Sequence, residues 1–126
     1  GAIIRIEIGE TALRAELNES ETAILLLETL PATLTLSRWG EEYYGACGVA
    51  FSDEHDAREI MEVGELAYWQ PGSAFCVFFG PTPASTDGRP KAASPVVPIG
   101  RILDDPSPLR SMGSSITAVL TTSIQD

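Results

Sequence analysis

Strict alternation of apolar and polar residues is the feature that most constrains how this chain can fold. It occurs in residues 2–8 (AIIRIEI), in residues 11–17 (TALRAEL) and again in residues 32–39 (ATLTLSRW). Side chains on a β-strand point to opposite faces in turn, so a period of two predicts strands that bury one face. Gly9 and Glu10 separate the first two segments, which predicts a β-hairpin at the start of the chain.

One segment has the period of a helix instead. Within residues 21–30 (ETAILLLETL), four apolar residues share one helical face: Ala23, Leu26, Leu27 and Leu30. Asn18, followed three positions later by Glu21, predicts a capping box at the start of this helix. Pro31 is expected to end it.

The remaining strand signals predict the architecture. Strands are expected within residues 40–51, 59–69 (strand, turn and strand), 74–80, 96–103 and 114–124. Seven or eight strands with one main α-helix predict a mainly β fold, a closed antiparallel β-barrel, because closure removes exposed strand edges. A chain of 126 residues suits one domain, spanning residues 1–126. Residues 81–95, rich in Pro, Ser and Thr, are predicted to be a surface loop that either covers a groove or only connects strands.

The charge balance narrows the range of partners. The chain has 8 Lys and Arg against 18 Asp and Glu, a formal net charge of -10 at pH 7. Nucleic acids and anionic membranes are therefore not expected as partners, because binding them requires a basic surface. The chain has no apolar run of about 18 residues, and residues 1–10 alternate with charges instead of forming a signal-peptide core, so we expect a cytoplasmic protein.

Metal and cofactor chemistry is not expected either. Cys47 and Cys76 lack the spacing of a metal site and have no histidine nearby in the sequence. The single histidine, His55, lies in a highly charged segment, where an exposed and solvated side chain is the usual outcome. The sequence therefore predicts no metal site, no cofactor and no thiol chemistry.

Aromatic residues gather in the second half of the chain. Five of them lie between positions 68 and 79: Tyr68, Trp69, Phe75, Phe78 and Phe79. In a strand, Phe75 and Phe79 share one face with Val77, while Cys76 and Phe78 share the other, and at least one set must fill the barrel. Tyr68 and Trp69 come just before a Pro-Gly turn, where amphipathic rings meet solvent and suit a ligand wall. We expect residues 75–79 to be mostly core, with residues 68–72 and Phe78 as candidates for a groove.

A pair of carboxylates follows Trp39 and Gly40. Glu41 and Glu42 are adjacent, so in a strand at most one of them lines a groove while the other meets solvent. Tyr43 and Tyr44 divide in the same way. One carboxylate beside aromatic rings suits a cation or an amide, whereas the alternative is that both are solvated charges at a strand edge.

The order of these elements resembles the cyclophilin barrel. Residues 64–82 (GELAYWQPGSAFCVFFGPT) resemble a cyclophilin stretch whose glycine, leucine, aromatic-pair and threonine positions correspond to Gly64, Leu66, Phe78, Phe79 and Thr82. Residues 96–105 (VVPIGRILDD) are similar to a later cyclophilin segment. The motifs WGEEYYG at residues 39–45 and YWQPGSAFCVFFGPTPAS at residues 68–85 resemble those of small prokaryotic cyclophilin-like proteins of uncharacterised function. This resemblance implies a minimal cyclophilin fold.

Cyclophilins catalyse rotation about Xaa-Pro bonds with an arginine, and the resemblance implies that Arg38 is its counterpart here. However, Glu41 and Glu42 stand where the family has a Gln-Gly-Gly region, and Pro95 stands where it has a histidine. The first hypothesis is therefore a binding module for a small molecule or an extended peptide. Its groove would be lined by Trp39, one of Glu41 and Glu42, Tyr44, Tyr68, Trp69, Phe78 and Thr82. The alternatives are a weak or divergent peptidyl-prolyl isomerase with Arg38 as catalytic donor, and an interaction subunit without a pocket.

Overall fold

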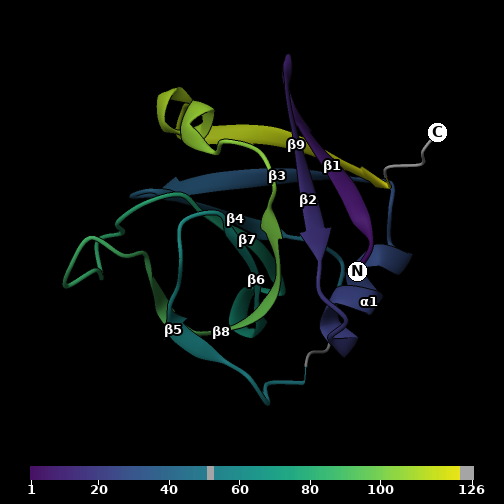
Figure 1. The fold of residues 1–126 in the computed structure, drawn as a ribbon, viewed down its shortest axis with the longest axis horizontal. Coiled ribbons are helices and arrows are strands. Elements are labelled where there is room, and N and C mark those ends of the chain that lie inside the picture. Colours follow the sequence, from purple (N-terminus) through teal and green to yellow (C-terminus); the bar gives the residue numbers. More distant parts are fainter. Residues whose placement is uncertain (51–52, 123–126) are drawn as a thin grey trace.

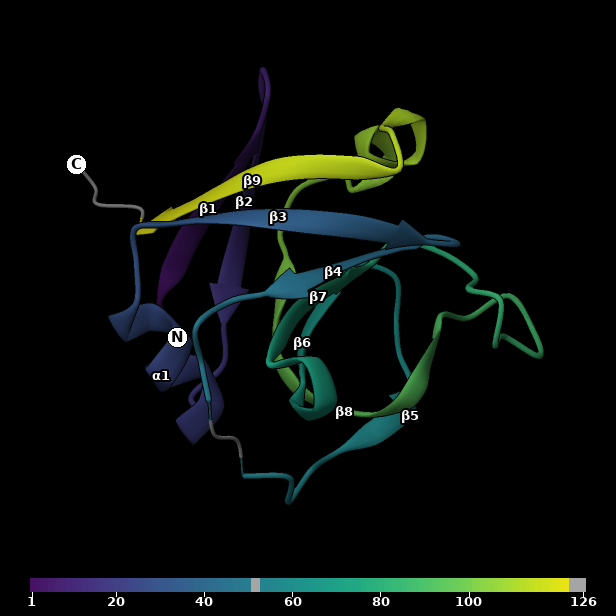
Figure 2. The same ribbon diagram turned by 180° about the vertical axis from the view of Figure 1, so that it is seen from behind.

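A computed structural model describes residues 1–50 and 53–122 of the chain. Within these residues it contains nine β-strands, one α-helix and two 3-10 helices (Figures 1 and 2). The strands are β1 (Ile3–Ile8), β2 (Thr11–Leu17), β3 (Ala32–Trp39), β4 (Glu42–Ala46), β5 (Arg58–Ile60), β6 (Glu65–Trp69), β7 (Ala74–Phe78), β8 (Lys91–Ile102) and β9 (Ser115–Thr122). The helices are α1 (Glu21–Glu28), η1 (Gln70–Gly72) and η2 (Ser107–Ser111). None of the helices in the described part of the chain is long and apolar enough to cross a membrane.

Eight of the strands described form a closed antiparallel ring. Their order is β2-β1-β9-β3-β4-β7-β6-β8, and pairing of β2 with β8 closes the ring. Short strand β5 pairs with the first part of β8 and takes no part in the ring. The prediction of a closed, mainly β fold with one main helix is confirmed, and β5 raises the number of strands to nine among the residues described.

The interior of the ring holds the main hydrophobic core. The alternation in the sequence places one face of each strand inside, as Ile4 and Ile6 of β1 and Leu34 and Leu36 of β3 illustrate. From β7 and the residue after it, Phe75, Val77 and Phe79 enter the same core. They are the first of the two sets expected from the sequence.

A second, smaller cluster lies on the other face of β6 and β7. Its buried members are Met61, Ala67, Cys76, Phe78, Ala92 and Val96. The first half of β8 supplies the last two, so this strand leaves the ring and folds over the outer face of its neighbours (Figure 2). Strand β7 is therefore buried on both faces, in agreement with the expectation that residues 75–79 are mostly core.

Helix α1 lies beside the ring and begins differently from the prediction. The N-cap is Ser20, whose Oγ accepts a hydrogen bond from the Ala23 backbone N–H at 3.1 Å. Asn18 instead accepts from the Ser20 N–H, so the expected pairing of Asn18 with Glu21 is not formed. Ala23 and Leu26 are buried in the main core, which attaches the helix to the ring.

Strand β8 is longer than the sequence predicted. The expected loop over residues 81–95 ends at Pro90, because β8 begins at Lys91. The register between β5 and β8 shifts between Arg58 and Ile60, and an irregular ladder of this kind accommodates Pro95, which has no N–H to donate. Position 51 and positions 123–124 of the predicted strands lie outside the described residues.

Candidate functional site

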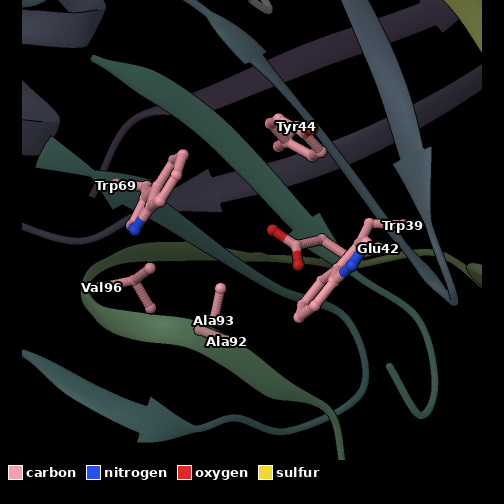
Figure 3. Close-up of a pocket in the computed structure, with 7 residues that line it drawn as sticks. All are labelled: Trp39, Glu42, Tyr44, Trp69, Ala92, Ala93 and Val96. Atoms are coloured by element: carbon pink, nitrogen blue, oxygen red, sulfur yellow. The ribbon is translucent and has the colours of Figure 1, made fainter. Parts of the chain in front are cut away.

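A pocket opens on the outer face of the ring, between β4 and the first half of β8 (Figure 3). Its cavity volume is about 190 Å³. We call it the two-tryptophan pocket and define it by the residues that line it: Trp39, Glu42, Tyr44, Trp69, Ala92, Ala93 and Val96. These residues come from β3, β4, β6 and β8, so strands that are distant in sequence build one concave surface.

The β3–β4 hairpin supplies the first wall. Trp39 and Glu42 are cross-strand partners on either side of a two-residue turn, Gly40-Glu41. Gly40 has a φ of 60°, as a two-residue hairpin turn with glycine at its first position requires. A Cβ atom at Gly40 would also lie 2.7 Å from Cδ of Pro83. The turn therefore depends on glycine for conformation and for space, and it fixes the indole and the carboxylate on one face.

Tyr44 and Trp69 form a second aromatic wall. Their ring centroids lie 6.2 Å apart, and the ring planes are nearly perpendicular at 82°. Nε1 of Trp69 donates a hydrogen bond to Oγ of Ser94 at 2.7 Å. Because this bond satisfies the polar edge of the indole and fixes its orientation, the apolar ring is presented to the pocket.

The floor of the pocket comes from β8, and the sequence analysis missed it. Ala92, Ala93 and Val96 lie within or next to the segment predicted to be a loop. Their small size leaves room between the aromatic walls. The available signal was the run Ala92-Ala93 followed by Val96-Val97, but the intervening serine and proline were typical of a loop.

Glu42 is the only charged residue among those lining the pocket, and it is only 5% exposed. Its carboxylate points into the space between the two indoles (Figure 3). None of the ion pairs formed by residues 1–50 and 53–122 involves Glu42. Burial raises the pKa of Glu42 from 4.5 to about 7, because the charged form loses its hydration, and a hydrogen bond with the Cys76 thiol opposes this only in part.

The two cysteines are free and both are buried. Burial and the neighbouring Glu42 carboxylate raise the pKa of Cys76 well above its usual value, so this thiol stays protonated. In the part of the chain that the structure describes, no three His, Cys, Asp or Glu side chains come together in a way that could hold a metal ion. The chemistry of the pocket therefore rests on Glu42 and the aromatic rings.

Arg38 lies away from the pocket, on the opposite face of β3 from Trp39. Its guanidinium donates hydrogen bonds to the carbonyl oxygens of Gly40, Arg110 and Met112 at 2.8, 3.0 and 2.9 Å. It also stacks over Phe79, with Cζ 5.1 Å from the ring centroid. These contacts hold the η2 segment against the end of the ring, so Arg38 is placed as a structural residue and not beside a ligand in the pocket.

Four other residues expected in the groove do not line the pocket. Tyr68 points into the ring interior, where its hydroxyl donates to the carbonyl of Val49. Phe78 is fully buried in the smaller cluster on the pocket side of β7, and Thr82 uses its hydroxyl to hold the backbone of Lys91 at the start of β8. Glu41 lies in the hairpin turn, with its carboxylate 3.6 Å from Nε of Arg110.

Comparison with known proteins covers almost the entire chain. A family model described as Cyclophilin-like matches residues 2–120. The solution structure of a hypothetical protein from Archaeoglobus fulgidus is similar, with a TM-score of 0.82 and 34% sequence identity over 97% of this chain and 95% of that chain. No curated protein matches the chain. The matched region includes every residue of the two-tryptophan pocket.

Proposed function

This chain belongs to the cyclophilin-like family, as its motifs predicted, and from the site on this fold we propose that it is a binding module. Its ligand is a small molecule, or one side chain of an extended peptide, held in the two-tryptophan pocket. The cytoplasmic location expected from the sequence is part of this proposal.

The convergence of aromatic side chains is the observation that carries the proposal. Trp39, Tyr44 and Trp69 come from three different strands and line one concavity. Ligand sites are typically apolar and aromatic hollows with a small number of placed polar groups, and here Glu42 is the charged group. Large aromatic side chains that only filled a core would not need to leave an open space between them.

The size of the pocket limits what it can hold. A volume of about 190 Å³ is below the range of roughly 300 to 1,000 Å³ that is usual for drug-sized ligands. A compact head group or a single side chain fits this space. The rest of a larger ligand would extend along the surface beside β8.

The isomerase alternative lacks its donor in this pocket. The resemblance implied that Arg38 would polarise the prolyl bond, but the guanidinium is hydrogen-bonded to backbone carbonyls around η2. It lies on the opposite face of β3 from Trp39, which lines the pocket. We therefore prefer binding without catalysis.

The chain's own tryptophans provide the test. The protein has two Trp residues, and both line the pocket, so intrinsic fluorescence and the two indole N–H resonances report on this site alone. We expect a library of small fragments to contain compounds that shift both signals saturably. A Trp39→Phe variant should keep one resonance and bind the same compounds more weakly. If no fragment perturbs either indole at millimolar concentration, the pocket is not a ligand site.

A further inference from the structure

The two-tryptophan pocket contains a buried carboxyl group, and no cationic side chain among residues 1–50 and 53–122 pairs with it. Glu42 is only 5% exposed, and within the described part of the chain the group that offers it a hydrogen bond is the neutral Cys76 thiol. Burying a carboxylate without a cation is costly, so such groups are usually paired. Among the residues described, Arg38, the cation nearest to Glu42 in the sequence, donates to backbone carbonyls, and Lys91, next to Ala92, lies 3.9 Å from Glu59.

We propose that the missing partner is the ligand, and that the pocket recognises a methylated ammonium group. This inference rests on the proposed binding function and names its ligand class. The trimethylammonium head of a choline-like molecule and the side chain of a trimethylated lysine share this chemistry.

The aromatic rings favour a cation of this kind. A positive charge is attracted to the face of an aromatic ring within about 6 Å, and most strongly to tryptophan, when both are shielded from water. The nearly perpendicular rings of Tyr44 and Trp69 form a corner, and Trp39 lies on the other side of the Glu42 carboxylate (Figure 3). A cation between them would meet aromatic faces and the carboxylate at once.

The apolar lining favours methyl groups over N–H donors. A primary ammonium carries three donors, each of which needs an acceptor once it leaves water. Among the side chains that line this pocket, only the Glu42 carboxylate and the Tyr44 hydroxyl can accept a hydrogen bond. Methyl groups instead make apolar contact with Ala92, Ala93 and Val96, so methylation removes unsatisfied donors and adds contact area.

Two electrostatic observations agree with a cationic ligand. The protein has a net charge of -10, which raises the local concentration of cations around it. The pKa of Glu42 is raised to about 7. The titratable groups that face Glu42 are Cys76 on β7 and Tyr44 on β4, and no charged side chain lines the pocket from β3 or β8. A bound cation would stabilise the carboxylate form, so affinity should rise with pH as Glu42 loses its proton.

An isosteric pair of compounds tests the charge. Choline and 3,3-dimethyl-1-butanol have the same shape, but the first has a quaternary nitrogen where the second has a carbon. We expect choline to quench or shift the tryptophan fluorescence with an affinity about tenfold or more above that of the alcohol. Ethanolamine, which has the charge without the methyl groups, should bind more weakly than choline.

A matched pair of variants tests the carboxylate. Glu42→Gln should reduce choline affinity by about tenfold or more and leave binding of the neutral alcohol unchanged. Glu41→Gln makes the same chemical change one residue earlier, outside the pocket, and should leave choline affinity unchanged. Thermal denaturation and the amide spectrum of each variant establish that it is folded.

The outcomes separate the inference from the function on which it rests. Equal or tighter binding of the neutral alcohol overturns the ammonium inference, while the pocket remains a binding site. Binding of ethanolamine as tight as that of choline overturns the preference for methylation. If neither these compounds nor the fragment library perturbs the indoles, both proposals fail. If choline does bind, its affinity is compared with that of a short peptide that contains trimethyllysine. Tighter binding of the peptide assigns the cation to a protein side chain, and tighter binding of choline assigns it to a free molecule.

Discussion

Trp39 and Glu42 face each other across the end of the β3–β4 hairpin, and the indole and the carboxylate share one pocket. The turn between them holds this arrangement, since the Glu41 N–H donates to the Pro81 carbonyl and the Glu41 carbonyl accepts from the Phe79 N–H, at 2.9 Å each. An apolar ring thus stands beside a carboxylate that has little water around it. This pairing is the basis of the proposed affinity for cations, and the burial of the carboxyl group makes its charge depend on pH near neutrality.

The buried carboxylate should make stability depend on pH. The folded-state pKa of Glu42 is raised from 4.5 to about 7, so the folded state holds a proton that the unfolded state releases between these values. Stability should therefore fall as pH rises through this window, and level off above pH 7. Relative to Glu42→Gln, the free energy of unfolding of the parent protein should decrease by about 2 to 3 kcal/mol between pH 5 and 8.

Urea denaturation of both proteins at several pH values measures this difference. Taking the difference between the two proteins cancels the titration of all other groups. A difference that does not change between pH 5 and 8 would mean that the Glu42 carboxylate is well hydrated and not perturbed.

Removing the Arg38 guanidinium should affect stability and not binding. Arg38→Ala loses the bonds to the carbonyls of Arg110 and Met112 and the stacking on Phe79, which should cost about 2 kcal/mol. Arg101→Ala, at an exposed position of β8, is the control and should cost little. Ligand affinity measured by tryptophan fluorescence should be the same in both variants and the parent.

The same Arg38 variant decides the isomerase alternative. We expect an assay on a panel of Xaa-Pro peptides to give no rate difference between Arg38→Ala and the parent, because the guanidinium lies away from the pocket. Catalysis present in the parent and lost in a folded Arg38→Ala would instead establish a divergent prolyl isomerase that uses this arginine.

Loss of the Ser94 hydroxyl should loosen one wall of the pocket. Ser94→Ala removes the acceptor of the Trp69 Nε1–H bond, which is 2.7 Å long, so the indole is free to turn. We expect several-fold weaker ligand binding and a shifted Trp69 indole resonance, with a loss of stability of about 1 kcal/mol. Ser115→Ala, at an exposed position of β9, should change none of these. Unaltered binding in Ser94→Ala would mean that neighbouring side chains suffice to orient Trp69.

Loss of the hydroxyl should lower stability at Tyr68 but not at Tyr44. Tyr68→Phe leaves the buried carbonyl of Val49 without its donor, and should cost about 1 to 2 kcal/mol of stability without changing ligand affinity. Tyr44→Phe keeps the ring in the pocket and should change stability by less than about 0.5 kcal/mol. Weaker ligand binding in Tyr68→Phe would contradict the placement of Tyr68 inside the ring.

The aromatic walls and the carboxylate of the pocket were among the residues that local rules singled out, but its floor was not. Alternation with a period of two predicted the strands. Applied to adjacent residues, it also predicted that at most one of Glu41 and Glu42 would line a groove. The same alternation also places Tyr68 and Trp69 on opposite faces of their strand, because the side chains of adjacent strand residues cannot line the same wall. The structure places Trp69 in the pocket and Tyr68 in the core.

Other features depend on contacts between distant segments. The sequence by itself determined most of the strands, the one main helix and the family, because alternation, periodicity and motifs are properties of consecutive residues. Only the tertiary structure decided that the first half of β8 folds over β6 and β7 and forms the pocket floor. It also decided that Glu42 is buried while Glu41 is not, because burial depends on what lies opposite a side chain in space.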